Sequence, residues 1–264
     1  MNISVKNSIG LFDSGIGGSS IWKEIHQVLP NEDTIYLADS KNAPYGQKTE
    51  DEILALSIKN TEFLLNKNCK LIVVACNTAT TNAIAYLRDN YDVPFIGIEP
   101  AIKPASIHTK TNTIGILATK GTLNSNLFAK TSTKFSSNVK VVEQIGEGLV
   151  ELIENGKLIS PEMTELLQKH LQKLTHHSID YLVLGCTHYP YLIPQIKKII
   201  HPTIRIIDSG LAVAKQTERV LSIKSLLYQE KRNTTNLFYT NTNTAVLKEL
   251  LQSYPKVRVE KLDF

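Results

Sequence analysis

The sequence predicts an α/β protein made of two similar parallel-sheet domains. Apolar runs of four or five residues alternate with helix-length segments along nearly the whole chain, which is the pattern of parallel α/β proteins. The runs LIVV (71–74) and YLVL (181–184) are apolar at consecutive positions, as expected for strands covered on both faces. Three pairs of segments also resemble each other at a nearly constant spacing, which predicts that one half repeats the other.

The apolar runs define the expected strands, and the amphipathic segments between them define the helices. Strands are expected at 9–12, 34–37, 71–75, 95–98, 113–117, 139–142, 181–184 and 204–207. Helices are expected at 50–66, 79–90, 161–174 and 191–200. Ser160 before Pro161 is a helix start signal, because serine caps a helix and proline suits its first position.

The repeat sets the expected domain boundaries. Each segment of the first half matches one about 105 to 110 residues later in the chain. The pairs are SIGLFDSGIGG (8–18) with TIGILATKGTL (113–123), IVVACNT (72–78) with LVLGCTH (182–188), and FIGIEPA (95–101) with IRIIDSG (204–210). We therefore expect a first domain over 1–99 and 209–264, and a second over 100–208. The tail segments NLFYT and VRV are expected to pack back on the first half.

Composition excludes several classes of protein. The 264 residues are 42% hydrophobic and 20% charged, with a net charge of +4 and no dense Lys/Arg stripe, so no nucleic-acid partner is expected. No apolar run approaches the ~20 residues that cross a bilayer, so no membrane partner is expected, and no signal peptide is recognised. Three cysteines without C-x-x-C spacing indicate neither a disulfide framework nor a zinc site. A cytoplasmic location is expected.

Two of the three cysteines occupy equivalent places in the repeat. Cys76 and Cys186 each follow the C-terminal end of an expected strand, and ligands of open parallel sheets bind outside those ends. Two halves that face each other would place the two thiols on opposite walls of one cleft. The active site is therefore expected in the cleft between the domains, whereas Cys69 is interpreted as core.

Two opposed thiols suit a particular reaction. A thiol is a plausible acid or, once ionised, a base near neutral pH. Together they can remove a proton from one face of a carbon and deliver one to the other face, which inverts a stereocentre. Asn77, Thr78 and Thr187 stand at expected helix N-termini, where anions bind. Asp13 and His188 are placed to assist Cys76 and Cys186.

Five motifs together resemble glutamate racemase, a cofactor-independent family of the aspartate/glutamate racemase superfamily. They are FDSGIGG (12–18), PYG (44–46), ACNTAT (75–80), LATKGT (117–122) and GCTHYP (185–190), and the resemblance covers essentially the whole chain in the order and spacing of the family. The resemblance implies two α/β domains with an interdomain site that interconverts L- and D-glutamate for peptidoglycan synthesis. It implies no cofactor and no metal, glutamate as the small-molecule substrate, and a homodimer as one candidate assembly.

The resemblance also assigns residue roles. Cys76 would take the proton from D-glutamate and Cys186 from L-glutamate, with Asp13 and His188 as assisting groups. The substrate would be held by Ser14, Tyr45, Gly46, Asn77, Thr78, Thr119 and Thr187. An acidic residue is also expected within GEGLVELIEN (146–155), where Glu154 is the candidate and Glu147 and Glu151 compete with it.

Other interpretations stay open at this stage. Thr119 could be a helix N-cap and Tyr45 a turn-packing residue. A nicotinamide-dependent oxidoreductase is suggested by Gly15-x-Gly17-x-x-Ser20 and by Asp39 at the end of the next strand, although Ser20 replaces the third glycine. A non-catalytic amino-acid binder would not need both thiols. Racemisation of aspartate or another acidic amino acid would use the same residues.

Overall fold

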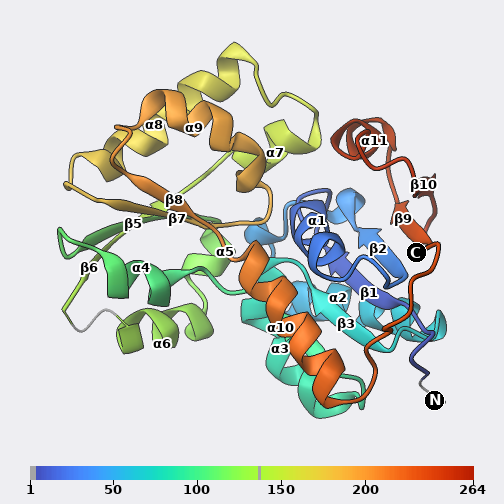
Figure 1. Cartoon of the computed structure of the whole chain (residues 1–264). Coiled ribbons are helices and arrows are strands. Elements are labelled where there is room, and N and C mark those ends of the chain that lie inside the picture. Colours follow the sequence, from blue (N-terminus) through green and yellow to red (C-terminus); the bar gives the residue numbers. More distant parts are fainter. Residues whose placement is uncertain (1–3, 136–137) are drawn as a thin grey trace.

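The chain forms two parallel β-sheets, each with helices on both faces (Figure 1). A computed structural model describes residues 4–135 and 138–264. The first sheet has the strand order β10-β9-β2-β1-β3-β4, with β1 Ile9–Asp13, β2 Thr34–Ala38, β3 Leu71–Val74, β4 Phe95–Gly97, β9 Asn236–Thr240 and β10 Val257–Lys261. The second has the order β6-β5-β7-β8, with β5 Thr113–Ala118, β6 Lys140–Ile145, β7 Tyr181–Gly185 and β8 Arg205–Ile207.

The two sheets share one topology. The order β2-β1-β3-β4 in the first sheet corresponds to β6-β5-β7-β8 in the second, and every pairing is parallel. The repeat and the fold class predicted from the sequence are thereby confirmed. The C-terminal segment adds β9 beside β2 and then β10, so the tail packs on the first half as expected. The residue boundaries of the two domains stay a prediction.

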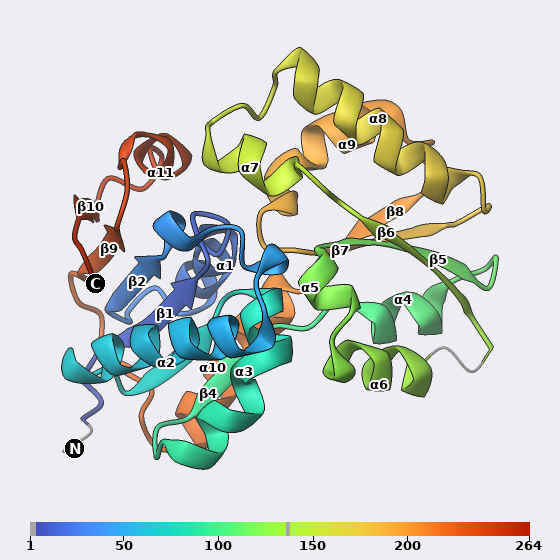
Figure 2. The ribbon, with the colours of Figure 1, turned by 180° about the vertical axis from the view of Figure 1, so that it is seen from behind.

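Helices cover both faces of each sheet, as the view from behind also shows (Figure 2). Around the first sheet lie α1 Ser19–Val28, α2 Glu50–Asn66, α3 Asn77–Asn90, α10 Gly210–Ile223 and α11 Ala245–Leu250. Around the second lie α4 Ile102–His108, α5 Lys120–Leu123, α6 Asn126–Phe135, α7 Leu149–Glu154, α8 Pro161–Thr175 and α9 Ile193–Ile199. None of the described helices is long and apolar enough to span a membrane.

Local sequence explains where the helices begin. The Thr49 hydroxyl accepts a hydrogen bond from the Glu52 N–H, and the Glu52 carboxylate accepts one from the Thr49 N–H, so this capping box starts α2. Ser160 caps α8 as predicted. The single helix expected at 191–200 is wrong at its start. A 3₁₀ turn, η3 Tyr189–Leu192, precedes α9, because Pro190 and Pro194 each favour a helix start over a helix interior.

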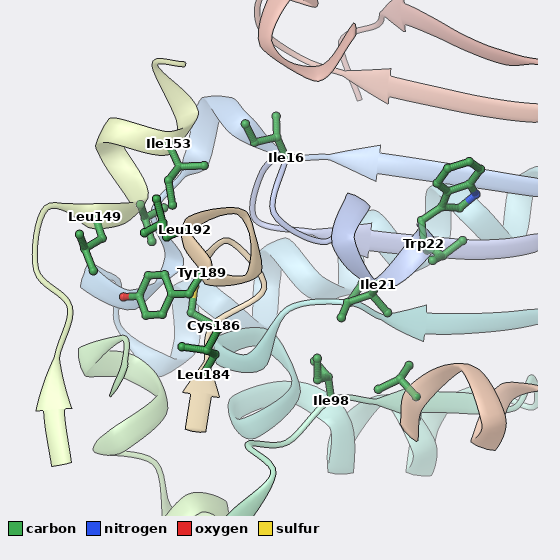
Figure 3. Close-up of a cluster of buried hydrophobic side chains, with 14 of the residues drawn as sticks. Ile16, Ile21, Trp22, Ile98, Leu149, Ile153, Leu184, Cys186, Tyr189 and Leu192 are labelled. Carbon is green, nitrogen blue, oxygen red and sulfur yellow. The ribbon is translucent and has the colours of Figure 1, made fainter. Parts of the chain in front are cut away.

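A hydrophobic core runs from one half of the molecule into the other. Buried side chains such as Ile21 and Trp22 of α1 belong to the same cluster as Leu149 of α7 and Tyr189 of η3 (Figure 3). The chain crosses between the halves twice, after β4 and after β8. The Ser209 hydroxyl of the second crossing donates to the Glu99 carbonyl of the first, so the two crossings lie side by side.

Candidate active site

The two predicted thiols line one small cavity between the halves. Cys76 follows β3 of the first sheet, and Cys186 follows β7 of the second. The cavity holds about 10 Å³, which is room for about one water molecule. Its walls also contain Ser14, Pro44, Tyr45, Gly46, Asn77, Thr78, Thr119, Val150, Thr187 and His188. The structure thus brings every predicted substrate residue to the place where the two thiols meet.

Cys76 is held at the start of a helix. It is the N-cap of α3, and its sulfur accepts a hydrogen bond from the Ala79 N–H at 3.4 Å. Its S–H donates to Ser14 Oγ at 3.7 Å. Burial, and then the charge of Asp13, raise the pKa of the Cys76 thiol well above its ordinary value. Cys76 is therefore a protonated thiol, an acid, at neutral pH.

Asp13 lies behind Cys76 and does not line the cavity. It ends β1, is fully buried, and accepts a hydrogen bond from the Gly18 N–H at 2.7 Å. Burial raises the pKa of Asp13 from 3.8 to about 6, while the charge of His188 and hydrogen bonds from Gly18 and Cys76 act in the opposite direction. A carboxyl with this pKa can exchange a proton with Cys76 near neutral pH.

The raised pKa of Asp13 predicts a pH-dependent stability. The folded protein binds this proton more tightly than the unfolded chain, so the stabilisation is present below a pH of about 4 and is lost as the pH rises through about 6. Asp13→Asn is neutral throughout. Between pH ~4 and pH ~8 its unfolding free energy should rise relative to wild type by on the order of 3 kcal/mol. Urea unfolding of both proteins at the two pH values measures this, and a pH-independent difference would contradict it.

Cys186 has a different partner. His188 Nδ1 lies 3.7 Å from Cys186 Sγ, and His188 Nε2 lies 2.6 Å from Glu154 Oε1. Burial alone would lower the pKa of His188, but hydrogen bonds with Cys186 and Glu154, together with their charges, raise it well above its ordinary value. His188 is therefore an imidazolium between a sulfur and a carboxylate.

Glu154 is the acidic residue of its segment that reaches the site. Its Oε1 also accepts from the Ile16 N–H at 2.7 Å, and its Oε2 accepts from Ser40 Oγ at 2.7 Å, so α7 is tied to the first half. Glu151 instead accepts a hydrogen bond from Gln47 at the surface. The carbonyl of Glu147 is hydrogen-bonded to His170. The competition between the three glutamates is thus resolved by tertiary contacts.

The polar groups around the cavity differ in how free they are. Both side-chain polar atoms of Asn77 are buried without a partner among the described residues, which indicates a place for a ligand. Thr119 is the N-cap of α5, as the alternative interpretation held, and its hydroxyl also lies 2.8 Å from that of Thr78. The Tyr45 hydroxyl donates to Asp39 and accepts from Asn60, so its proton is not available to a substrate.

The two glycines and the aspartate that suggested a dinucleotide site contact other parts of the protein. A Cβ atom on Gly15 would lie 2.0 Å from Glu154 Oε1, and one on Gly17 would lie 2.2 Å from His188 Nδ1. The glycines therefore let the second half approach closely. The Asp39 carboxylate accepts hydrogen bonds from the side chains of Asn42, Tyr45 and Asn241. Among the described residues no group of three or more His, Cys, Asp or Glu side chains is placed to bind a metal.

Val150 and Ser40 were not predicted. Val150 of α7 is one of the apolar side chains on the cavity wall, and nothing in its sequence context separates it from a core valine. Ser40 contacts the site through Glu154, which is 114 positions away in the sequence. The sequence indicated Glu154 as a candidate residue of the site, but it did not indicate that Ser40 contacts it.

Comparison with known proteins agrees with this geometry. The model of the Asp/Glu/Hydantoin racemase family matches residues 11–217. The chain belongs to this family. Among its family relatives, glutamate racemase of Pseudomonas syringae pv. tomato is 46% identical over 83% of this chain and 80% of that protein. Glutamate racemase of Ectopseudomonas mendocina is 43% identical over 95% of this chain and 97% of that protein.

Solved structures of family members have the same architecture. The crystal structure of glutamate racemase from Francisella tularensis in complex with D-glutamate matches with a TM-score of 0.84. The two sequences are 30% identical, and the match covers 98% of each chain. The racemase family membership and the two-sheet fold are therefore supported by sequence and structure together.

Proposed function

We propose that this protein is a cofactor-independent glutamate racemase that supplies D-glutamate for peptidoglycan synthesis in the cytoplasm. The observation that carries the proposal is the pair of thiols from opposite sheets in one cavity, each with its own ionisable partner. Relatives of similar length named glutamate racemase support glutamate as the substrate. A homodimer remains a prediction.

Each thiol serves one face of the substrate α-carbon. With L-glutamate, the Cys186 sulfur removes the α-proton and the Cys76 thiol delivers its proton to the opposite face; with D-glutamate the roles reverse. His188 as an imidazolium stabilises negative charge on the Cys186 sulfur, and Asp13 exchanges protons with Cys76. Asn77, together with backbone N–H groups at the start of α3, would hold a carboxylate. The protonated Cys76 thiol suits the enzyme form that accepts L-glutamate.

Deuterium incorporation in heavy water tests both the reaction and the substrate. Each enantiomer of glutamate and of aspartate is incubated with enzyme freed of pyridoxal phosphate and metals. Glutamate should racemise fully, with one solvent deuteron at the α-carbon of the product from the first turnovers. Aspartate racemising faster than glutamate would favour the alternative substrate. Absence of both exchange and racemisation with glutamate would refute the proposal.

Variants of the two partner residues should affect the two directions differently. L- and D-glutamate have equal free energies, so kcat/KM must fall equally in both directions for any variant. Asymmetry can therefore appear only in kcat and KM separately. Asp13→Asn should lower kcat more with D-glutamate, for which Cys76 is the base, and His188→Asn more with L-glutamate. The larger losses should be about a hundredfold. Equal kcat losses in the two directions would contradict the assigned partners.

A further inference from the structure

A buried carboxylate lies directly behind the PYG segment of the cavity wall. Asp39 follows β2 and is fully buried. Its Oδ2 accepts a hydrogen bond from the Tyr45 hydroxyl at 2.5 Å, and its Oδ1 accepts from Asn42 Nδ2 at 2.8 Å. The Tyr45 hydroxyl in turn accepts from Asn60 Nδ2 at 3.1 Å. The position of the Tyr45 ring is thus determined by a charged anchor and not by the substrate.

The C-terminal segment completes this anchor. Strand β9 pairs with β2 so that Thr240 lies opposite Ala38, which puts the next residue, Asn241, beside Asp39. Asn241 Nδ2 donates to Asp39 Oδ1 at 2.6 Å, and Asn241 Oδ1 accepts from the Lys41 N–H at 2.8 Å. One buried amide therefore fixes both the carboxylate and the backbone that leads from β2 to the cavity.

The segment that this anchor holds fits closely against the other half. Gly46 packs on Thr119 so tightly that an added Cβ atom would lie 2.9 Å from the Thr119 Cβ. Pro44, Tyr45 and Gly46 all line the cavity, whereas Asn241 does not. A shift of this segment by a few tenths of an ångström would therefore change the cavity wall without moving either thiol.

We propose that Asn241 is a positioning residue for substrate binding, which acts through Asp39 and Tyr45 on the PYG segment. The inference rests on the proposed function only for the identity of the substrate. It gives the C-terminal strands a role in the active site. The carboxylate of Asp39 needs its donors because it is buried, and without the Asn241 donor it is free to shift and to carry the hydrogen-bonded Tyr45 hydroxyl with it.

Asn241→Ala should raise the KM for glutamate about tenfold, the effect of one lost hydrogen bond to a charged group, and leave kcat within about twofold. Asn243→Ala is the matched control. Asn243 is an exposed asparagine of the same segment, and among the described residues its side chain accepts a hydrogen bond only from the Ala245 N–H at the start of α11. Its KM should stay at the wild-type value. An unchanged KM in Asn241→Ala would overturn the proposal.

A double-mutant cycle separates positioning from a general loss of stability. In a Tyr45→Phe background the tenfold effect of Asn241→Ala should become clearly smaller, because the route through Asp39 and the Tyr45 hydroxyl is already cut and only the contact with the Lys41 N–H is left to lose. Additive effects of the two substitutions would overturn the proposal. Hydrogen exchange of the peptide that spans residues 40–48 should be faster in Asn241→Ala than in Asn243→Ala. This measurement does not depend on turnover, so it tests whether Asn241 holds this segment in place even if the wild-type protein fails to racemise glutamate. Equal exchange rates in the two variants would refute the positioning role of Asn241.

Discussion

Replacement of either Cys76 or Cys186 by alanine is expected to reduce racemisation at least about a thousandfold in both directions. Each direction needs one thiol as base and the other as acid, so loss of either one removes half of the proton transfer in every turnover. The circular dichroism signals of L-glutamate and of D-glutamate, each followed separately, measure both directions. The thermal unfolding midpoint of each variant shows that the loss is not caused by misfolding.

Cys69→Ala is the matched control for the thiol variants. Cys69 is also buried, but it packs in a core cluster under Gly10 and does not line the cavity. Burial raises the pKa of Cys69 to about 12, and its sulfur packs against Gly10 in the core, where no substrate reaches it. Its variant should lose some stability through a small cavity and keep its turnover. A Cys76 or Cys186 variant as active as Cys69→Ala would rule out the two-thiol mechanism.

Gly17→Ala is expected to lower kcat/KM about a hundredfold without changing a reacting group. The added methyl group would lie 2.2 Å from His188 Nδ1, so either the imidazole leaves its place between Cys186 and Glu154 or the two halves stay apart. Both outcomes disturb the alignment on which proton transfer depends. Steady-state kinetics with L- and D-glutamate measure the loss.

The cause of the Gly17→Ala effect can be isolated with a second substitution. His188→Ala removes the ring that the new methyl group would meet. If the clash is the cause, Gly17→Ala should add almost nothing to the loss that His188→Ala already produces. A further hundredfold loss in the double variant would show that the glycine is needed for another reason, such as the Asp13–Gly18 turn that follows β1.

The sequence was most informative where chemistry and local pattern coincide. Consecutive apolar residues predicted β3 and β7, and the small residues and cysteines after them indicated the candidate site, because ligands bind at the strand ends of parallel sheets. The offset between the two halves predicted a shared topology before any strand order was known. The thiols and their neighbours could therefore be predicted from a single sequence without knowledge of tertiary contacts.

The remaining site residues depend on contacts between distant parts of the chain. Glu154 could not be distinguished from Glu151, because both lie on one short helix and only the packing of α7 on the first half selects between them. Asn241 is about 200 positions from Asp39, and only the pairing of β9 with β2 brings them together. Pattern and propensity contain no information on such pairs. The hydrogen bond from the Tyr45 hydroxyl to Asp39 could likewise not be predicted from the sequence.

The two adjacent crossings between the halves have a consequence for affinity. The covalent connections between the halves therefore lie along one edge, where Ser209 and Glu99 tie them together. A cavity that holds about one water has to enlarge before an amino acid can enter it. The apparent dissociation constant is then the intrinsic one divided by the fraction of the protein whose cavity is enlarged. Contacts that hold the two halves together in the absence of substrate therefore weaken apparent binding, even though they shape the cavity in which the reaction takes place.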